Sequence, residues 1–186
     1  MTEWEKMIAS ERYNPTDPDL TERRFVAREK MAEFNKTGPR ELERRVAILK
    51  SLFGGTGQTI YIEPTFSCDY GTNIHVGENF YANYNCVILD VAEVRIGKNA
   101  MLAPCVGIYT AAHPLNPRER ISGIEFAKPI TIGDNCWIGG HAVINPGVTL
   151  GDNVVVASGA VVTKSFGDNV VIAGCPARVI RTIDSE

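Results

Sequence analysis

Three histidines, His75, His113 and His141, are the candidates for acid–base chemistry in this sequence. Imidazole titrates near neutral pH, so a positioned histidine can take a proton from a hydroxyl nucleophile. His113 lies in a stretch rich in prolines and charges and is followed directly by Pro114. We therefore predict that His113 acts as a general base, and we expect packing or solvent-exposed roles for the other two.

A zinc site is the alternative use for three histidines. Structural and catalytic zinc sites usually include a closely spaced pair of ligands. Here the gaps between successive histidines are 38 and 28 residues. We therefore predict that no metal is required.

Cations near the C-terminus suggest a site for a phosphorylated ligand. Lys164 follows Thr163 at the end of the last regular repeat, and Arg178 and Arg181 come shortly after. Guanidinium and ammonium groups are the usual partners of phosphate. A solvated charged tail is the alternative interpretation.

The five cysteines, at positions 68, 86, 105, 136 and 175, include no C-x-x-C pair. Cys86 and Cys136 fall at repeat positions that hold alanine or valine elsewhere, which indicates small core residues in a reducing compartment. Because no basic residue stands next to a cysteine, we predict no thiol nucleophile.

A hydrophobic residue at every sixth position indicates the fold that positions these histidines, cations and cysteines. The series runs through Ile96, Leu102 and Ile108, and again through Ile132, Ile138, Ile144, Leu150, Val156 and Val162. This period fits neither a helix nor a simple strand, and it is typical of hexapeptide repeats that stack as a β-helix.

A second period gives the size of one coil. A tetrad of apolar residue, Gly, charged residue and Asn begins at positions 76, 96, 132 and 150, and a related tetrad begins at Phe166. The steps of 20, 36, 18 and 16 residues correspond to coils of about 18 residues, one of which carries an insertion. Stacked coils should place Asn135 beside Asn153, at corners where Gly and Asn tolerate a positive φ.

Two other segments depart from this rhythm. Residues 1–55 are charged with apolar residues at helical spacing, among them Leu20, Phe25, Met31 and Phe34. They predict a helical cap that packs on the β-helix domain, residues 56–186, or on a neighbouring subunit. Residues 109–129 predict one inserted loop, a common place for functional residues.

Composition excludes several classes of protein. The net charge of −3 argues against a nucleic-acid-binding protein. No apolar stretch is long enough for a membrane span, and the first residues do not form a signal peptide. A cytoplasmic location is the default expectation.

The motifs together resemble the maltose and galactoside O-acetyltransferases along essentially the whole chain. The segments that carry the resemblance are Asn73–Asn83, Tyr109-Thr110-Ala111-Ala112-His113-Pro114, Trp137-Ile138-Gly139-Gly140 and Asn145-Pro146-Gly147-Val148. Glu5-Lys6-Met7-Ile8-Ala9 resembles the start of the cap, and Cys68-Asp69-Tyr70-Gly71 and Leu89-Asp90-Val91 favour the maltose branch.

This resemblance implies a fold, a reaction and an assembly. The fold is mostly β, a left-handed parallel β-helix, although parallel crossovers are nearly always right-handed. The resemblance also implies acetyl-CoA as co-substrate, a sugar hydroxyl as acceptor, no metal, and a homotrimer with active sites between subunits.

The resemblance implies six residues of the catalytic and acceptor site. Asp17 is a seventh, weak candidate. His113 matches the catalytic histidine and Asn83 matches a residue at the junction of acceptor and acetyl group, whereas Asp69 and Tyr81 match the sugar pocket. An acceptor-binding aspartate of the galactoside branch corresponds to Val91, with Asp90 beside it. A methionine of that pocket corresponds to Glu125, which could orient the imidazole of His113.

The resemblance also implies a coenzyme-A site. Asn83, Thr163 and Lys164 match coenzyme contacts, and Arg178 and Arg181 match arginines near its phosphates. Gly140 and Ser158 occupy backbone-contact positions along the pantetheine arm.

The sequence thus predicts direct transfer from acetyl-CoA to a sugar hydroxyl, with the 6-hydroxyl of maltose or glucose as acceptor. One alternative is a hexapeptide acetyltransferase for a non-sugar hydroxyl. Another is a non-catalytic β-helix used for binding or scaffolding.

Overall fold

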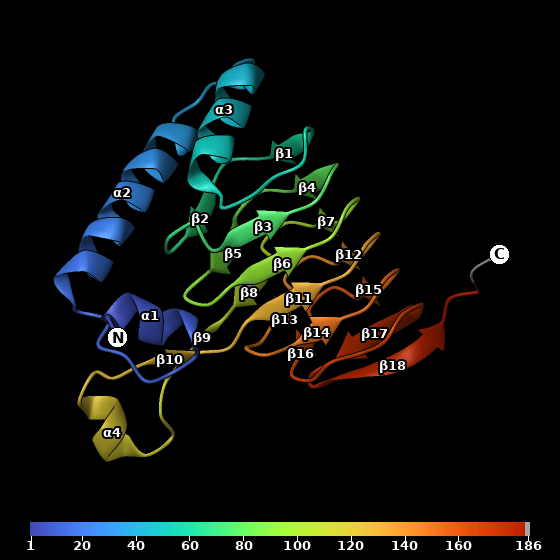
Figure 1. Ribbon diagram of the computed structural model, residues 1–186. Coiled ribbons are helices and arrows are strands. Elements are labelled where there is room, and N and C mark those ends of the chain that lie inside the picture. The colour runs from blue at the N-terminus through green and yellow to red at the C-terminus, as the bar shows by residue number, and fades with distance from the viewer. Residues whose placement is uncertain (185–186) are drawn as a thin grey trace.

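The computed structural model describes residues 1–184 and shows three N-terminal helices beside a stack of short strands (Figure 1). The helices are α1 (Glu3–Ile8), α2 (Pro18–Asn35) and α3 (Leu42–Leu52). Thr2 and Glu5 form the capping box that the sequence predicts at the start of α1. No helix in the described part of the chain has the length and apolar character needed to cross a membrane.

The strands form three flat faces that we name after β4, β5 and β6. The β4 face contains β1 (Ile60–Ile62), β4 (Phe80–Ala82), β7 (Met101–Leu102), β12 (Trp137–Ile138), β15 (Val155–Val156), β17 (Val170–Gly174) and β18 (Ala177–Thr182). The β5 face contains β2 (Phe66–Cys68), β5 (Cys86–Leu89), β8 (Gly107–Tyr109), β13 (Val143–Ile144) and β16 (Val161–Val162). The β6 face contains β3 (Ile74–Val76), β6 (Val94–Ile96), β11 (Ile130–Ile132) and β14 (Thr149–Leu150).

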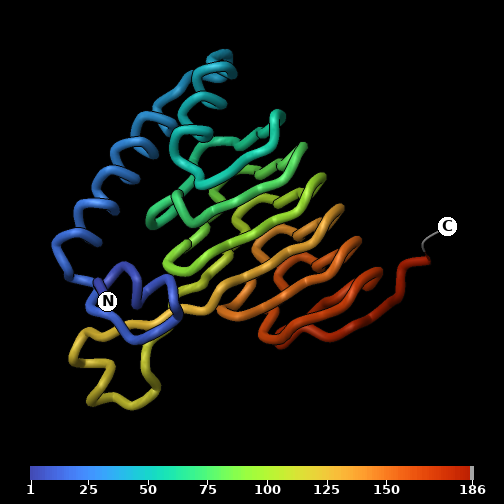
Figure 2. Tube along the Cα trace, viewed as in Figure 1, coloured from blue at the N-terminus to red at the C-terminus, as the bar shows by residue number. Residues whose placement is uncertain are grey.

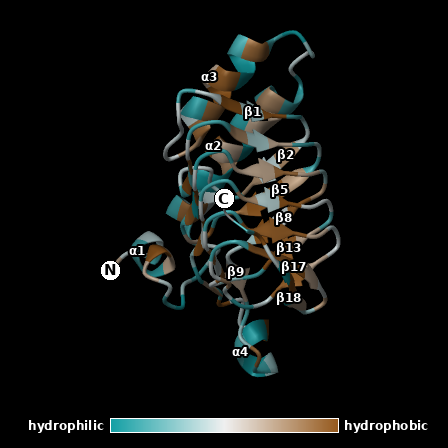
Figure 3. Ribbon diagram, turned by 90° about the vertical axis from the view of Figure 1, so that its right-hand side faces the viewer, coloured by the Kyte–Doolittle hydropathy of each residue, from teal (hydrophilic) through white to brown (hydrophobic). Residues whose placement is uncertain are grey.

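Successive strands along the chain move from one face to the next, and each strand pairs in parallel with its equivalent one coil later. Figure 3 shows β2, β5, β8 and β13 in one such column. The fold is therefore the predicted left-handed parallel β-helix, with about six turns. The last pair, β17 and β18, is antiparallel and ends the stack.

The apolar residues at every sixth position fill the interior of this three-sided β-helix, as predicted. All nine residues of the six-residue series from Ile96 to Val162 are buried, with at most 4% of their surface exposed. Burial of each such side chain stabilises the fold by about 1.5–3 kcal/mol. Cys86 and Cys136 are buried in the same core.

The edge between the β6 and β4 faces carries a ladder of asparagines. Asn135 donates from its side-chain amide to Asn153 Oδ1 at 2.9 Å, as the coil length predicts. The ladder continues with equivalent bonds at Asn79, Asn99 and Asn169, and all five residues have φ between 56° and 58°. The ladder sets the register of neighbouring coils at this edge.

The helical cap packs on the β-helix rather than standing apart from it. Met31, Phe34 and Leu49 belong to the same buried cluster as the coil residues. Phe25, which the sequence assigns to the apolar side of α2, is 51% exposed. The buried side is set by Leu20, Ala27, Met31 and Phe34, and Phe25 lies well round the helix from it because each residue advances about 100°. The division into a cap, residues 1–55, and a β-helix domain, residues 56–186, stays a prediction.

The inserted loop leaves the stack between the β5 and β6 faces (Figure 2). Its base is an antiparallel pair, β9 (Ala111–Ala112) with β10 (Phe126–Ala127), and its tip is α4 (Pro117–Ile121). The sequence predicts the loop and not this hairpin at its base. The hairpin matters because it gives His113 a defined partner strand.

Candidate functional site

A cavity of about 380 Å³ lies where the β5 face meets the β6 face, beneath the base of the inserted loop. Four parts of the chain line it: the arm before α2, α2 itself, the corners of two coils, and the hairpin of the loop. The lining residues are Tyr13, Pro15, Thr16, Arg24, Arg28, Asp69, Tyr70, Leu89, Val91, Ala111, His113 and Glu125. We name this hollow the His113 cavity.

The hairpin places His113 opposite Glu125. Ala112 pairs with Phe126 in the antiparallel register, so the next residue of one strand faces the preceding residue of the other. The Nε2 atom of His113 lies 3.9 Å from Oε1 of Glu125, which is longer than a hydrogen bond. The His113 side chain is 57% exposed and thus accessible to a substrate in the cavity.

Glu125 is held from the other side by Tyr13. The Tyr13 hydroxyl donates to Oε2 of Glu125 at 2.6 Å. Nothing in the sequence signals this contact, because 112 residues separate Tyr13 from Glu125. The sequence missed Tyr13 for that reason.

Asp69 brings a second carboxyl group to the cavity. Its pKa is raised by burial, while the guanidinium of Arg24 opposes the rise and the Glu125 carboxylate adds to it. Arg24 is fixed by hydrogen bonds to the Tyr70 hydroxyl at 2.8 Å and to the Pro15 carbonyl at 2.7 Å. The two arginines of the cavity, Arg24 and Arg28, are one helical turn apart on α2, a spacing that could have revealed them in the sequence.

Asp90 requires a correction, because it is fully buried and does not line the cavity. Its carboxylate accepts hydrogen bonds from the backbone N–H groups of Asp69 at 3.0 Å, Tyr70 at 2.9 Å and Asn73 at 3.3 Å. Asp90 thus holds the turn that presents Asp69, rather than touching an acceptor. Its two neighbours in sequence, Leu89 and Val91, line the cavity instead.

Asp90 should make the stability of the fold depend on pH. Burial raises the pKa of Asp90 to about 6, against the opposing hydrogen bond from Tyr70. Between the unfolded pKa, near 4, and this value, the native state binds more protons than the unfolded state, so stability falls as pH rises. The slope from one such group reaches about 1.4 kcal/mol per pH unit.

We expect Asp90→Asn to make the free energy of unfolding, measured in urea, depend less on pH between pH 4 and 6. Equal slopes for the wild type and the variant would contradict the titration of a buried Asp90.

Asp17 also departs from its expected role. Its side chain caps α2 by accepting from the backbone N–H groups of Asp19 and Leu20. The preceding residues, Pro15 and Thr16, line the cavity instead. Helix capping by aspartate satisfies N–H groups that would otherwise be unpaired.

Tyr81 and Asn83 lie on another side of the β-helix, away from the His113 cavity. Tyr81 is in β4, and Asn83 begins the corner that leads from the β4 face to the β5 face. His113 lies at the far side of the β5 face, where it meets the β6 face. A single chain therefore does not bring Tyr81 or Asn83 to His113.

The predicted coenzyme residues divide between the same two edges. Gly140 and Ser158 occupy the corner after the β4 face, stacked one coil apart through the Gly159 N–H and the Gly140 carbonyl at 2.8 Å. Thr163 and Lys164 follow β16 and lie on the His113 side of the β5 face.

Arg178 and Arg181 share one side of β18 although they are three residues apart. In a regular strand this spacing would place them on opposite sides. A register shift between Val171 and Ile172 lets Arg178 pair with Ala173 and Arg181 with Val171, two positions apart on β17. The irregularity thus keeps both exposed cations together.

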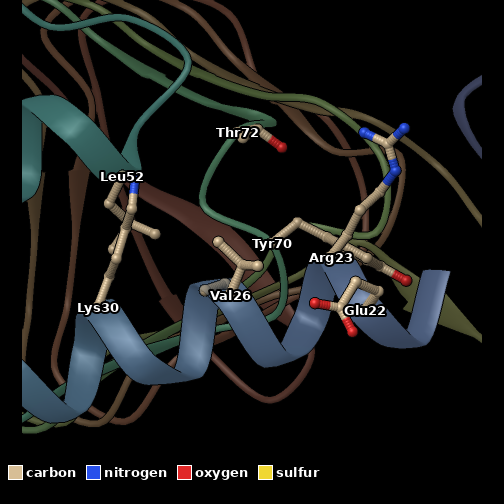
Figure 4. Close-up of a pocket in the computed structure, with 8 residues that line it drawn as sticks. Glu22, Arg23, Val26, Lys30, Leu52, Tyr70 and Thr72 are labelled. Carbon is tan, nitrogen blue, oxygen red and sulfur yellow. The ribbon is translucent and has the colours of Figure 1, made fainter. Parts of the chain in front are cut away.

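A smaller cavity of about 230 Å³ lies between α2 and the end of α3 (Figure 4). Val26 and Leu52 form its apolar part, and Tyr70 separates it from the His113 cavity. None of the predicted site residues lines this cavity. Within residues 1–184, no group of three or more His, Cys, Asp or Glu side chains is arranged to hold a metal ion.

Two segments of the chain match known families. Residues 6–57 match the family described as "Maltose acetyltransferase hexapeptide capping motif", and residues 129–164 match "Hexapeptide repeat of succinyl-transferase". A putative acetyltransferase of Dictyostelium discoideum is 61% identical over 98% of this chain and 95% of its own length. The chain belongs to the hexapeptide-repeat sugar O-acetyltransferase family.

Solved structures of hexapeptide-repeat sugar O-acetyltransferases superpose along the whole chain. A maltose O-acetyltransferase from Clostridium difficile 630 is 50% identical, with a TM-score of 0.98 and coverage of 100% of this chain and 99% of that one. A galactoside acetyltransferase in complex with coenzyme A is 43% identical, with a TM-score of 0.96 and coverage of 99% and 92%. The protein is an acetyltransferase.

Proposed function

We propose that this acetyltransferase transfers the acetyl group of acetyl-CoA to the 6-hydroxyl of maltose or glucose, with His113 as general base. The observation that carries the proposal is the His113 cavity, where an accessible imidazole lies beside two carboxyl groups. The similarity to a maltose O-acetyltransferase along the full chain supports the choice of acceptor.

The chemistry needs a base and no protein nucleophile, because a thioester is already activated. His113 takes the proton of the sugar hydroxyl while the oxygen attacks the thioester carbonyl carbon. The tetrahedral intermediate then collapses, the C–S bond breaks, and the imidazolium returns its proton to the coenzyme thiolate. General-base catalysis of this kind contributes about 10²- to 10⁴-fold in rate, or roughly 3–5 kcal/mol of barrier.

Glu125 gives this base its orientation. Its carboxylate lies on the Nε2 side of the ring and can stabilise the imidazolium that forms during transfer. The distance of 3.9 Å describes a protein without substrate, and such contacts often shorten in the working complex.

Asp69 and the arginines of α2 supply acceptor contacts. A partly buried carboxylate accepts hydrogen bonds from sugar hydroxyls, and arginine donates them. The apolar Val91 stands where a galactoside-type site would have an aspartate, and Glu125 stands where it would have a methionine, so the carboxylates of the cavity are placed differently. This difference favours a glucosyl over a galactosyl acceptor.

A homotrimer would complete the site. Tyr81 and Asn83 lie at the edge opposite His113, so a neighbouring subunit is needed to bring them to it. The β4 face presents a partly exposed apolar row to such a neighbour, in which Tyr61, Tyr81, Met101, Trp137, Val155 and Val171 follow one another in register. Exposed rows of this kind are typical of association surfaces.

Acetyl-CoA would lie along the same junction between subunits. Lys164, Arg178 and Arg181 supply cations for its phosphates, and Thr163 adds a hydroxyl. The corner backbone at Gly140 and Ser158 can pair with the amides of pantetheine. The free cysteines, three of which are buried, fit a cytoplasmic location, where acetyl-CoA is available.

The test of this proposal is the position of the transferred acetyl group. The protein is incubated with acetyl-CoA and maltose, glucose or 6-deoxyglucose, and products are analysed by mass spectrometry and NMR. We expect 6-O-acetyl products from the first two sugars and none from 6-deoxyglucose. Acetylation of 6-deoxyglucose would contradict the 6-hydroxyl, and no acetylated sugar at all would favour the non-sugar acceptor.

A further inference from the structure

We propose that Tyr13 is a positioning residue for acetyl transfer, because its hydroxyl holds the Glu125 carboxylate in place beside His113. The inference rests on the proposed roles of His113 and Glu125. It adds to the site a residue of the N-terminal arm, far away in sequence.

The Tyr13 ring is buried and points its hydroxyl at one atom. It packs in a cluster with Met7, Leu20, Tyr70 and Ala127. Its hydroxyl donates to Oε2 of Glu125 at 2.6 Å. Burial, followed by this hydrogen bond, raises the pKa of Tyr13 far above its usual value, so the hydroxyl stays protonated and can only donate to the carboxylate.

The backbones of the same two residues are also joined. The Tyr13 N–H donates to the Glu125 carbonyl at 3.0 Å, and the Glu125 N–H donates to the Tyr13 carbonyl at 3.2 Å. The arm thus forms a bridge to the strand of the loop that faces His113. Main chain and side chain of Glu125 are both fixed by one residue.

This arrangement leaves one carboxylate oxygen for the imidazole. Oε2 is occupied by Tyr13, and Oε1 is the atom 3.9 Å from Nε2 of His113. The Glu125 side chain is 25% exposed, so without the hydroxyl it could rotate toward solvent. The ring of Tyr13 serves the fold, whereas its hydroxyl serves the orientation of Glu125.

Tyr13→Phe separates these two functions, because it removes the hydroxyl and keeps the ring and the backbone bridge. We expect kcat to fall about tenfold, as for loss of a hydrogen bond to a charged group, with KM for acetyl-CoA and the melting temperature nearly unchanged. Arg12→Gln is the matched control: Arg12 joins the same arm to the same loop through Glu119 at 3.0 Å, and it does not touch Glu125. This control should keep the wild-type kcat.

A double-mutant cycle identifies the route of the effect. If Tyr13 acts through Glu125, then Tyr13→Phe should cause no further loss of kcat in a Glu125→Gln background. Additive losses, or a wild-type kcat in Tyr13→Phe, would overturn the proposal.

A readout without turnover separates this proposal from the proposed function. Histidine-selective ¹⁵N labelling gives three residues to assign, and Nε2 of His113 faces Glu125. Its ¹⁵N chemical shift should change in Tyr13→Phe in the same direction as in Glu125→Gln, and not in Arg12→Gln. An unchanged shift in Tyr13→Phe would overturn the role of Tyr13, even if no sugar proved to be an acceptor.

Discussion

Replacement of His113 by alanine should lower kcat for acetyl transfer by about 10²- to 10⁴-fold, the range for loss of a general base. In the proposed mechanism the imidazole is the accessible base of the cavity, which is also lined by the carboxyl groups of Asp69 and Glu125. The side chain is more than half exposed, so its removal should cost the fold little. The measurement is the steady-state rate with saturating maltose and acetyl-CoA.

His113→Asn is the companion variant, because it keeps a polar side chain of similar size but cannot accept the proton. It should be as slow as the alanine variant, and both should bind coenzyme A with wild-type affinity by calorimetry. Retention of more than about a tenth of the wild-type kcat in both variants would contradict the assignment of a base worth at least 10²-fold.

Mixing two inactive variants should restore activity. If each site takes His113 from one subunit and Asn83 from the next, then His113→Ala and Asn83→Ala damage different halves of it. In trimers assembled at random from equal amounts of both chains, about a quarter of the sites should carry both native residues. We expect about a quarter of the wild-type rate from co-expressed chains, against almost none from either variant alone.

The control for this experiment is a chain that carries both substitutions, mixed with His113→Ala. It supplies no native His113 and should give no recovery. Absence of recovery in the test mixture, with mixed trimers confirmed by mass spectrometry, would show that one subunit supplies both residues.

The coils were predictable because one local rule repeats at each turn of the chain. In a stack of three-sided coils, an apolar residue at every sixth position points into the interior of the stack. The residues of the series from Ile96 to Val162 are all buried there. The asparagine corners follow from the same period, so the sequence alone predicts that Asn135 lies beside Asn153. The inserted loop was visible as a break in that rhythm.

The site was less predictable because its contacts join segments without a shared period. Tyr13 meets Glu125 across 112 residues, and neither has a local signature of that pairing. Asp90 and Val91 show this at the scale of single residues: both are buried, and of the two Val91 lines the cavity whereas Asp90 does not. The resemblance points to this corner of the coil, but which of its side chains lines the cavity depends on the backbone conformation of the corner.

The most direct test of the account is thiol release from acetyl-CoA by the wild-type protein with maltose, glucose, a galactoside or no sugar, with His113→Ala as the blank. The account predicts fast release with maltose or glucose, slower release with the galactoside, and little release without acceptor or in the variant. Release that is independent of the sugar, or equal in His113→Ala, would contradict it.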